Sequence, residues 1–92
     1  TLSDGSAGGI EPGTITFPIC STLVDEYVLV SEEEIKAAMR LIIDQHHKII
    51  EGAAAVAVAA FLKQKEQFRD RTVVIIICGG NISTEKLRMV LD

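Results

Sequence analysis

Apolar residues recur at helical spacing between residues 31 and 50, and charged residues repeat every four positions on the opposite face. Ser31 and Glu34 have the spacing of a capping box, in which each side chain satisfies a free backbone amide of the other residue. The pattern predicts an amphipathic helix that starts after Ser31 and breaks at Glu51-Gly52. Its apolar face comprises Ile35, Ala38, Met39, Ile42, Ile43, His46, Ile49 and Ile50.

Three further helices follow from composition and start signals. A second long helix is expected from about Ala53 to Phe68; its alanine- and valine-rich first half is apolar all round, as in a helix buried on every side. A short helix is expected within residues 15–24, because Pro18 is tolerated in a first turn. Ser83 is expected to begin the last helix.

Two segments have the composition of β-strands. Residues 27–30 are rich in β-branched side chains, and residues 72–77 are continuously apolar, which is typical of a strand buried on both faces. The order loop, helix, strand, helix, helix, strand, helix predicts an α/β fold with parallel strands. Because two strands do not make a stable sheet, we expect a fragment of a larger domain.

Composition supports that expectation. The chain has 92 residues, of which 48% are hydrophobic, and begins at Thr1 without a methionine; its mean hydropathy is +0.31. A small domain this apolar is expected to cover part of its surface with more of its own chain or with a partner subunit. We therefore treat the chain as a piece of a longer protein.

Charge and cysteine usage narrow the function classes. The net charge of −4 argues against binding to nucleic acid or to an anionic membrane. The longest apolar run, residues 53–62, is too short to span a bilayer. Cys20 and Cys78 have no metal-ligand spacing and suggest a reducing compartment, so we expect a cytoplasmic protein.

The strongest candidate for chemistry is the turn "CGGN" at residues 78–81. Ligands of open α/β sheets bind beyond the carboxyl ends of strands, and the amides of a nearby helix start favour negative charge. The alternative is a tight turn in which glycine only supplies a positive φ. On spacing alone this alternative is favoured, because short glycine motifs are common.

Other polar residues have simpler explanations. Glu51 precedes the apolar helix and is either a capping group, the simpler interpretation, or a carboxylate that faces a site. His46 and His47 point about 100° apart on a helix, so they cannot bind one metal together. We expect packed or hydrogen-bonded histidines and a buried Cys20.

Four signals in fixed order resemble one enzyme family. They are the "SDG" loop at residues 3–5, the "LVDEYVLVSEEEI" junction, the glutamate before "GAAAVAVAAFL", and the strand that ends in "CGGN". Together they resemble the C-terminal part of the threonine dehydratase and serine racemase family, pyridoxal-phosphate enzymes with the tryptophan-synthase β-like fold (fold type II). The resemblance implies that residues 1–92 form a C-terminal portion of the large, three-layer cofactor-binding domain.

The resemblance also implies roles for individual residues. Cys78 matches the residue, often serine, that faces the pyridine nitrogen, and Gly79 matches the turn beside the ring. Gly5 matches a loop glycine on the cofactor face, and Glu51 a glutamate near the ring-nitrogen side. A thiol is a neutral partner, so it should leave the ring nitrogen largely unprotonated, which is compatible with elimination of a hydroxyl group.

The same resemblance places the cofactor-carrying lysine, the phosphate-binding loop and the metal ligands upstream of Thr1. No catalytic residue or metal ligand is therefore expected within this segment, which should be inactive alone. We expect a threonine/serine dehydratase that acts on a small amino acid and forms a homo-oligomer. A serine or hydroxyaspartate racemase or dehydratase, and a non-catalytic binding or assembly module, are the alternatives.

Overall fold

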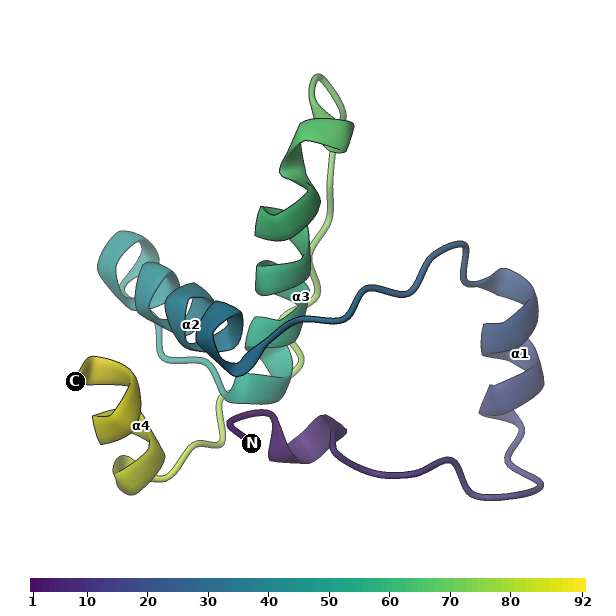
Figure 1. Ribbon diagram of the computed structural model, residues 1–92, viewed down its shortest axis with the longest axis horizontal. Coiled ribbons are helices and arrows are strands. Elements are labelled where there is room, and N and C mark those ends of the chain that lie inside the picture. Colours follow the sequence, from purple (N-terminus) through teal and green to yellow (C-terminus); the bar gives the residue numbers. More distant parts are fainter.

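The computed structural model describes all 92 residues and contains helices only (Figure 1). Two of the six helices are short 3-10 turns, called η1 and η2. In chain order the elements are η1 (Asp4–Ser6), α1 (Thr16–Leu23), α2 (Glu32–His46), α3 (Gly52–Gln64), η2 (Lys65–Phe68) and α4 (Thr84–Leu91). No helix is long and apolar enough to cross a membrane.

Helix α2 begins as the sequence predicts. Glu34 N donates to Ser31 Oγ at 3.1 Å, and Ser31 N donates to Glu34 Oε2 at 3.0 Å, which completes the capping box. The helix ends at His46, earlier than the apolar pattern predicts, because His47 adopts a left-handed conformation with φ 55°. A left-handed residue directly after the last turn is a common helix stop.

The core lies where α2 packs across α3. Small side chains on α3 bring the two helices close together, and Met39 of α2 is buried against them. Helix α4 packs on α2 through Val90, which is 1% exposed and belongs to the same hydrophobic cluster, and Arg40 Nη1 donates to Leu91 O at 3.2 Å. The buried hydrophobic residues are Leu2, Ile35, Ala38, Met39, Ile50, Ala54, Ala55, Val58, Ala59 and Val90.

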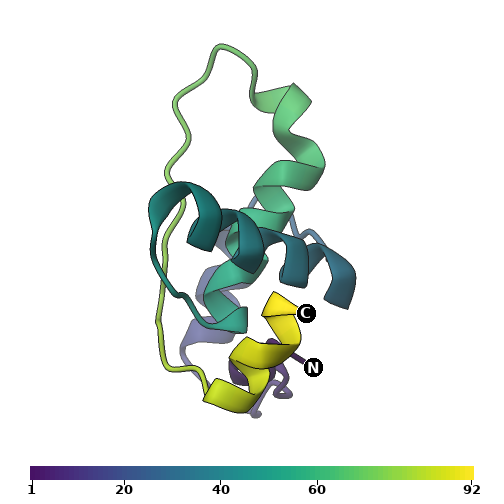
Figure 2. The same ribbon diagram turned by 90° about the vertical axis from the view of Figure 1, so that its left-hand side faces the viewer.

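The prediction of an α/β fold with parallel strands is wrong for this chain. Residues 27–30 and 72–77 are extended but belong to no strand, and no backbone hydrogen bond joins one segment to the other. The second segment runs along α3 (Figures 1 and 2), where Ile75 packs on the core while Val74 is 83% exposed. A strand requires a hydrogen-bonded neighbour, and apolar composition alone does not provide one.

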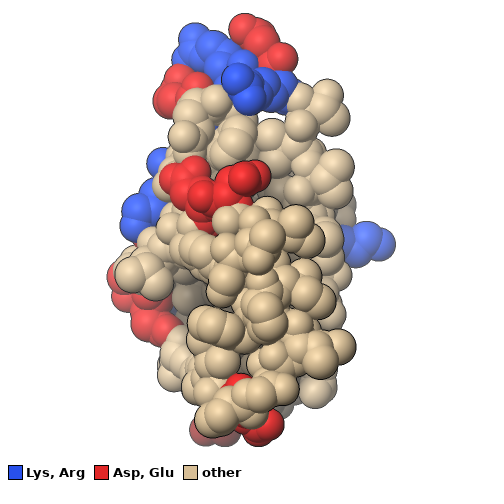
Figure 3. All heavy atoms as spheres, turned by 90° about the vertical axis from the view of Figure 1, so that its right-hand side faces the viewer, with Lys and Arg blue, Asp and Glu red and all other residues tan.

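Helix α1 stands apart from the other helices (Figure 1) and has no buried residue. Cys20, which we expected in the core, is exposed there because no other element covers α1. Ile15, Phe17, Ile19 and Leu23 are exposed as well. Figure 3, which views this side of the molecule, shows a surface that is largely uncharged.

Candidate functional site

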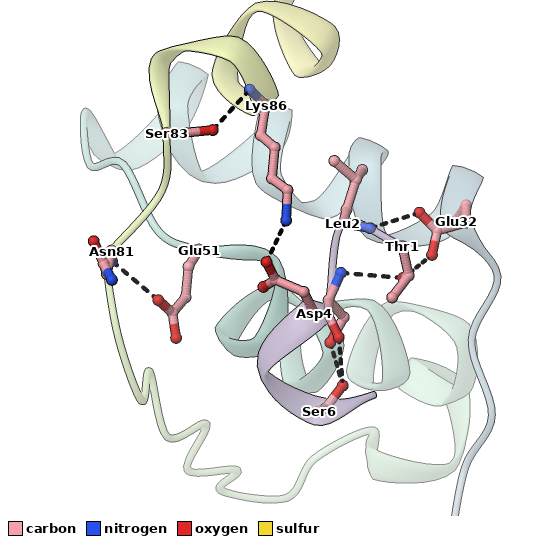
Figure 4. Close-up of polar contacts among 10 residues, drawn as sticks. Thr1, Leu2, Asp4, Ser6, Glu32, Glu51, Asn81, Ser83 and Lys86 are labelled. Atoms are coloured by element: carbon pink, nitrogen blue, oxygen red, sulfur yellow. Dashed lines mark hydrogen bonds and ion pairs between the residues drawn. The ribbon is translucent and has the colours of Figure 1, made fainter. Parts of the chain in front are cut away.

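The turn at residues 78–81 is held by Glu51 from thirty residues earlier in the chain. Glu51 N donates to Gly79 O at 3.1 Å, and Asn81 N donates to Glu51 Oε2 at 3.0 Å. Backbone and side chain of one residue therefore fix the turn at two points (Figure 4 shows the second). Glu51 occupies the N-cap position of α3, yet its side chain makes no capping hydrogen bond. The simpler interpretation, that Glu51 is a side-chain cap, is wrong.

The Glu51 carboxylate also accounts for glycine at position 79. A Cβ on Gly79 would lie 2.6 Å from Glu51 Oε1, which is closer than carbon and oxygen atoms pack. A Cβ on Gly80 would lie 3.2 Å from Ile49 O. The space left by both missing side chains is thus taken up by residues 49–51 of the same chain.

The N-terminal loop lies against the first turn of α3. A Cβ on Gly52 would overlap the Leu2 carbonyl oxygen, so only glycine permits this approach. Gly5 lies over Ala53, with 3.3 Å between an added Cβ and the Ala53 Cβ. Leu2 is buried, and its amide donates to Glu32 Oε2 at 2.9 Å. These contacts place Gly5 beside the residues that hold the turn.

A polar cavity of about 310 Å³ lies where the loop, the start of α3, the turn and α4 meet. Lys86 Nζ donates to Asp4 Oδ2 across it, and Figure 4 shows the Lys86 side chain extending from α4 to Asp4. This hydrogen bond and the positive charge of Lys86 lower the pKa of Asp4 below its ordinary value. The lining residues are Leu2, Asp4, Glu51, Gly52, Asn81, Ile82, Ser83 and Lys86.

The four residues singled out from sequence are not all brought to the same place. Gly79 and Glu51 are in contact. Gly5 does not line the polar cavity itself, but it directly follows Asp4, which does. Cys78 is exposed with a free thiol and does not line the polar cavity. The thiol is therefore available to a group that approaches the turn from outside the cavity.

Sequence analysis missed two residues of this region. Lys86 carried a weak signal, because a cation in the first turn of a helix opposes the helix dipole. Glu32 lies in the first turn of α2, where an acidic residue is ordinary, but it accepts from the Leu2 amide and from the Thr1 hydroxyl. Both hydrogen bonds lower the pKa of Glu32, and the one from the Leu2 amide has the larger effect.

A second, larger cavity of about 760 Å³ lies between α2, α3 and residues 75–80. Its lining is mostly apolar and includes His46, Phe61 and Ile77. Both His46 and His47 are exposed, so the expected packed histidines are not observed. No group of three or more His, Cys, Asp or Glu side chains is placed to hold a metal ion.

The sequence of the chain is similar to one enzyme family and to individual enzymes. A family model described as pyridoxal-phosphate dependent enzyme matches residues 1–79. An L-threonine ammonia-lyase of Geobacter sulfurreducens is 40% identical over 92 residues, which are 100% of this chain and 23% of that protein. The catabolic L-threonine dehydratase of Escherichia coli K12 is also 40% identical, with 98% of this chain and 28% of that protein covered.

A serine racemase of Dictyostelium discoideum is 38% identical over 96 residues, which cover 100% of this chain and 27% of the racemase. The chain therefore spans about a quarter of the length of these relatives.

Proposed function

Because the chain belongs to the pyridoxal-phosphate dependent enzyme family, we propose that it forms the ring-nitrogen side of a pyridoxal-phosphate site in a longer enzyme. The site is completed by the remainder of the same polypeptide, and residues 1–92 are a C-terminal portion of the cofactor-binding domain. The short share of each relative that the chain covers supports this proposal.

The residues of the turn at positions 78–81 fit the ring-nitrogen side of such a cofactor. The observation that carries the proposal is the Gly79 turn, fixed by Glu51 at two points beside the free thiol of Cys78. Cys78 faces the pyridine nitrogen, Gly79 and Glu51 hold the backbone next to it, and Gly5 lines the cofactor face. A carboxylate at position 78 would keep the ring nitrogen protonated, whereas a thiol is neutral and a weak hydrogen-bond partner.

The proposed reaction is deamination of threonine or serine to a 2-oxo acid and ammonia. Pyridoxal phosphate, when bound, withdraws electrons from the α-carbon of the amino acid. The names of two relatives, an ammonia-lyase and a dehydratase, support this reaction. The role of this chain is to place a neutral group at the ring nitrogen and a rigid backbone beside it.

The cofactor-carrying lysine lies outside this segment in our proposal. Within the segment, Lys86 Nζ is engaged in its ion pair with Asp4 across the polar cavity. Lys36, Lys63 and Lys65 line neither the polar cavity nor the larger apolar one, and Lys48 lies on the apolar cavity.

Racemisation is the second candidate, supported by the serine racemase relative. A dehydratase and a racemase, including those that act on hydroxyaspartate, differ in product. A dehydratase releases a 2-oxo acid and ammonia, whereas a racemase returns the opposite enantiomer of its substrate.

The test is a titration of the full-length apo-protein with pyridoxal phosphate, followed by product assays with L-threonine, L-serine and L-threo-3-hydroxyaspartate. We expect a cofactor absorption band and release of 2-oxo acid. A band together with D-serine as the main product would favour the racemase. Absence of any cofactor band would overturn the proposal and favour a non-catalytic binding or assembly module.

The exposed apolar surface supports assembly with more protein. Large hydrophobic side chains are exposed on α1 and on residues 73–77, and an apolar surface of this kind is typical of an interface. We propose that the rest of the polypeptide and a second subunit cover these regions in a cytoplasmic homo-oligomer. Size measurement of the full-length protein by light scattering tests the oligomer.

A further inference from the structure

The ion pair between Lys86 and Asp4 joins residues 82 positions apart in the sequence. Two of the other three ion pairs lie three or four residues apart, and the third joins α3 to the first turn of α2. The Lys86 pair is therefore the only one that ties the N-terminal loop to α4 (Figure 4).

Lys86 stands at a position that its own helix disfavours. Its amide donates to Ser83 Oγ at 3.2 Å, which places it in the first turn of α4 at the positive end of the helix dipole. A residue that opposes a local preference is expected where another role requires it. The Lys86 side chain is also more enclosed than that of Asp4, with exposures of 32% and 74%.

The loop that Lys86 holds is packed closely against the first turn of α3. Leu2 O lies against Gly52, and Gly5 lies against Ala53, so the loop cannot move toward α3. Two cavities border the loop, the polar cavity and one of about 270 Å³ that is lined by Thr1, Ser3, Ser6 and Ala7. Lys86 bridges the polar cavity and so opposes displacement of Asp4 away from α4.

These contacts form a closed ring. Asp4 bonds Lys86 of α4, α4 follows the turn at Asn81, Asn81 bonds Glu51, and Gly52 next to Glu51 contacts Leu2 of the loop. Loss of the Lys86 link would leave the loop and the turn joined only through Glu51 and Gly52 at the start of α3.

We propose that Lys86 is a positioning residue, whose ion pair with Asp4 fixes the Gly5 loop relative to the Gly79 turn. Since both segments face the cofactor, the pair sets the spacing of two walls of its site. This inference rests on the proposed function, because only a bound cofactor makes that spacing matter to chemistry.

The experiment compares the full-length protein with Lys86→Met, which keeps the length of the side chain and removes its charge. The first measurement is hydrogen exchange of the Ser6 and Ala7 amides, which donate within η1 to Ser3 O and Asp4 O. We expect about two- to fivefold faster exchange, the range for loss of an exposed ion pair. The second is titration of the apo-protein with pyridoxal phosphate, where we expect a dissociation constant raised by a similar factor.

Three control variants make the result specific. Lys86→Arg keeps the charge and should restore both values, as should the exchanged pair Asp4→Lys with Lys86→Asp. Lys65→Met removes an exposed lysine that makes no ion pair and should change neither value. The exchanged pair remains informative if Lys86→Met does not fold.

The two readouts separate this inference from the proposed function. Unchanged amide exchange in Lys86→Met would overturn the inference even if the protein binds pyridoxal phosphate. Faster exchange with unchanged cofactor affinity would overturn the positioning role. If the wild-type protein binds no pyridoxal phosphate, the proposed function fails and the positioning role toward the cofactor fails with it.

Discussion

Glu51 accepts a hydrogen bond from the backbone amide of Asn81, with 3.0 Å between Oε2 and N. The two residues are 30 positions apart, and the contact makes the first residue before α3 an anchor for the turn before α4. The other Glu51 oxygen lies where a Gly79 side chain would begin. One carboxylate thus fixes both the path of the turn and the type of residue allowed in it.

Glu51→Ala should destabilise the protein by about 1–2 kcal/mol, because it removes a charge-assisted hydrogen bond. Glu51→Gln keeps an acceptor oxygen and should recover at least half of this loss. Urea denaturation of both variants measures the free energy of unfolding. In the full-length enzyme Glu51→Ala should also change the absorption spectrum of bound cofactor or its pH dependence. A change in stability with no spectral effect would show that Glu51 serves only the fold.

Gly79→Ala should destabilise the protein by about 1–3 kcal/mol, because the new methyl group displaces the Glu51 carboxylate. Gly9→Ala is the matched control, since nothing lies within 4 Å of a Cβ at that position. The double variant Gly79→Ala with Glu51→Ala should cost less than the sum of the two single changes, because the carboxylate that clashes is absent. Strictly additive losses in the thermal melts would mean that the two residues do not interact.

Cys78→Ser should retain most of the proposed dehydratase turnover in the full-length enzyme, because serine is also a neutral hydrogen-bond partner. Cys78→Asp should alter turnover strongly, because a carboxylate favours protonation of the ring nitrogen. Steady-state kinetics and cofactor absorption spectra measure both effects. Identical kinetics and spectra in the wild type and both variants would remove Cys78 from the site.

Glycine substitutions at two adjacent histidines should change the stability of the protein in opposite directions. His47 has φ 55°, so His47→Gly should stabilise the protein by a few tenths to about 1 kcal/mol through relief of backbone strain. His46 is the last residue of α2, and His46→Gly should destabilise by up to about 1 kcal/mol through lower helix propensity. Differential scanning calorimetry of the two variants tests this difference. Lower melting temperatures in both would mean that His47 contributes contacts that outweigh its strain.

Stability should fall in acid because of Asp4. Lys86 lowers the pKa of Asp4 below 3.8, so the folded state binds a proton at this group less readily than the unfolded state. The contribution of the ion pair is therefore complete above about pH 5 and is lost as pH falls through the lowered pKa. Urea midpoints of wild type and Asp4→Asn should differ at pH 7 and converge as pH falls through the lowered pKa of Asp4. Glu32 has a lowered pKa for a different reason, so Asp4→Asn should keep part of the acid sensitivity.

The helices could be predicted from sequence because their signals are local. Ser31 and Ser83 mark the starts of α2 and α4, and the alanine-rich run marks α3. The left-handed turn at His47 has no such signal, so the end of α2 was predicted too late. The extended segments were mistaken for strands because pairing depends on a neighbour that composition does not reveal.

In the candidate site, too, some features are visible in the sequence and others appear only in the folded chain. Glycine at position 79 is visible in the sequence, but its partner Glu51 is identified only when the chain folds back on itself. Lys86 could have been noticed as a cation at the wrong end of a helix, although its partner Asp4 is 82 residues away. The site is formed by contacts between segments that are distant in sequence, and the periodicity of apolar residues does not reveal such contacts.

Gly52 has a consequence that reaches beyond packing. Any side chain there would displace Leu2, and the segment that follows Leu2 carries Asp4 and Gly5. A substitution at this position would therefore act on the start of α3 and on the loop of the site in a single step. At Gly52, a substitution that alters the site also alters the fold, so we expect this position to tolerate very little variation.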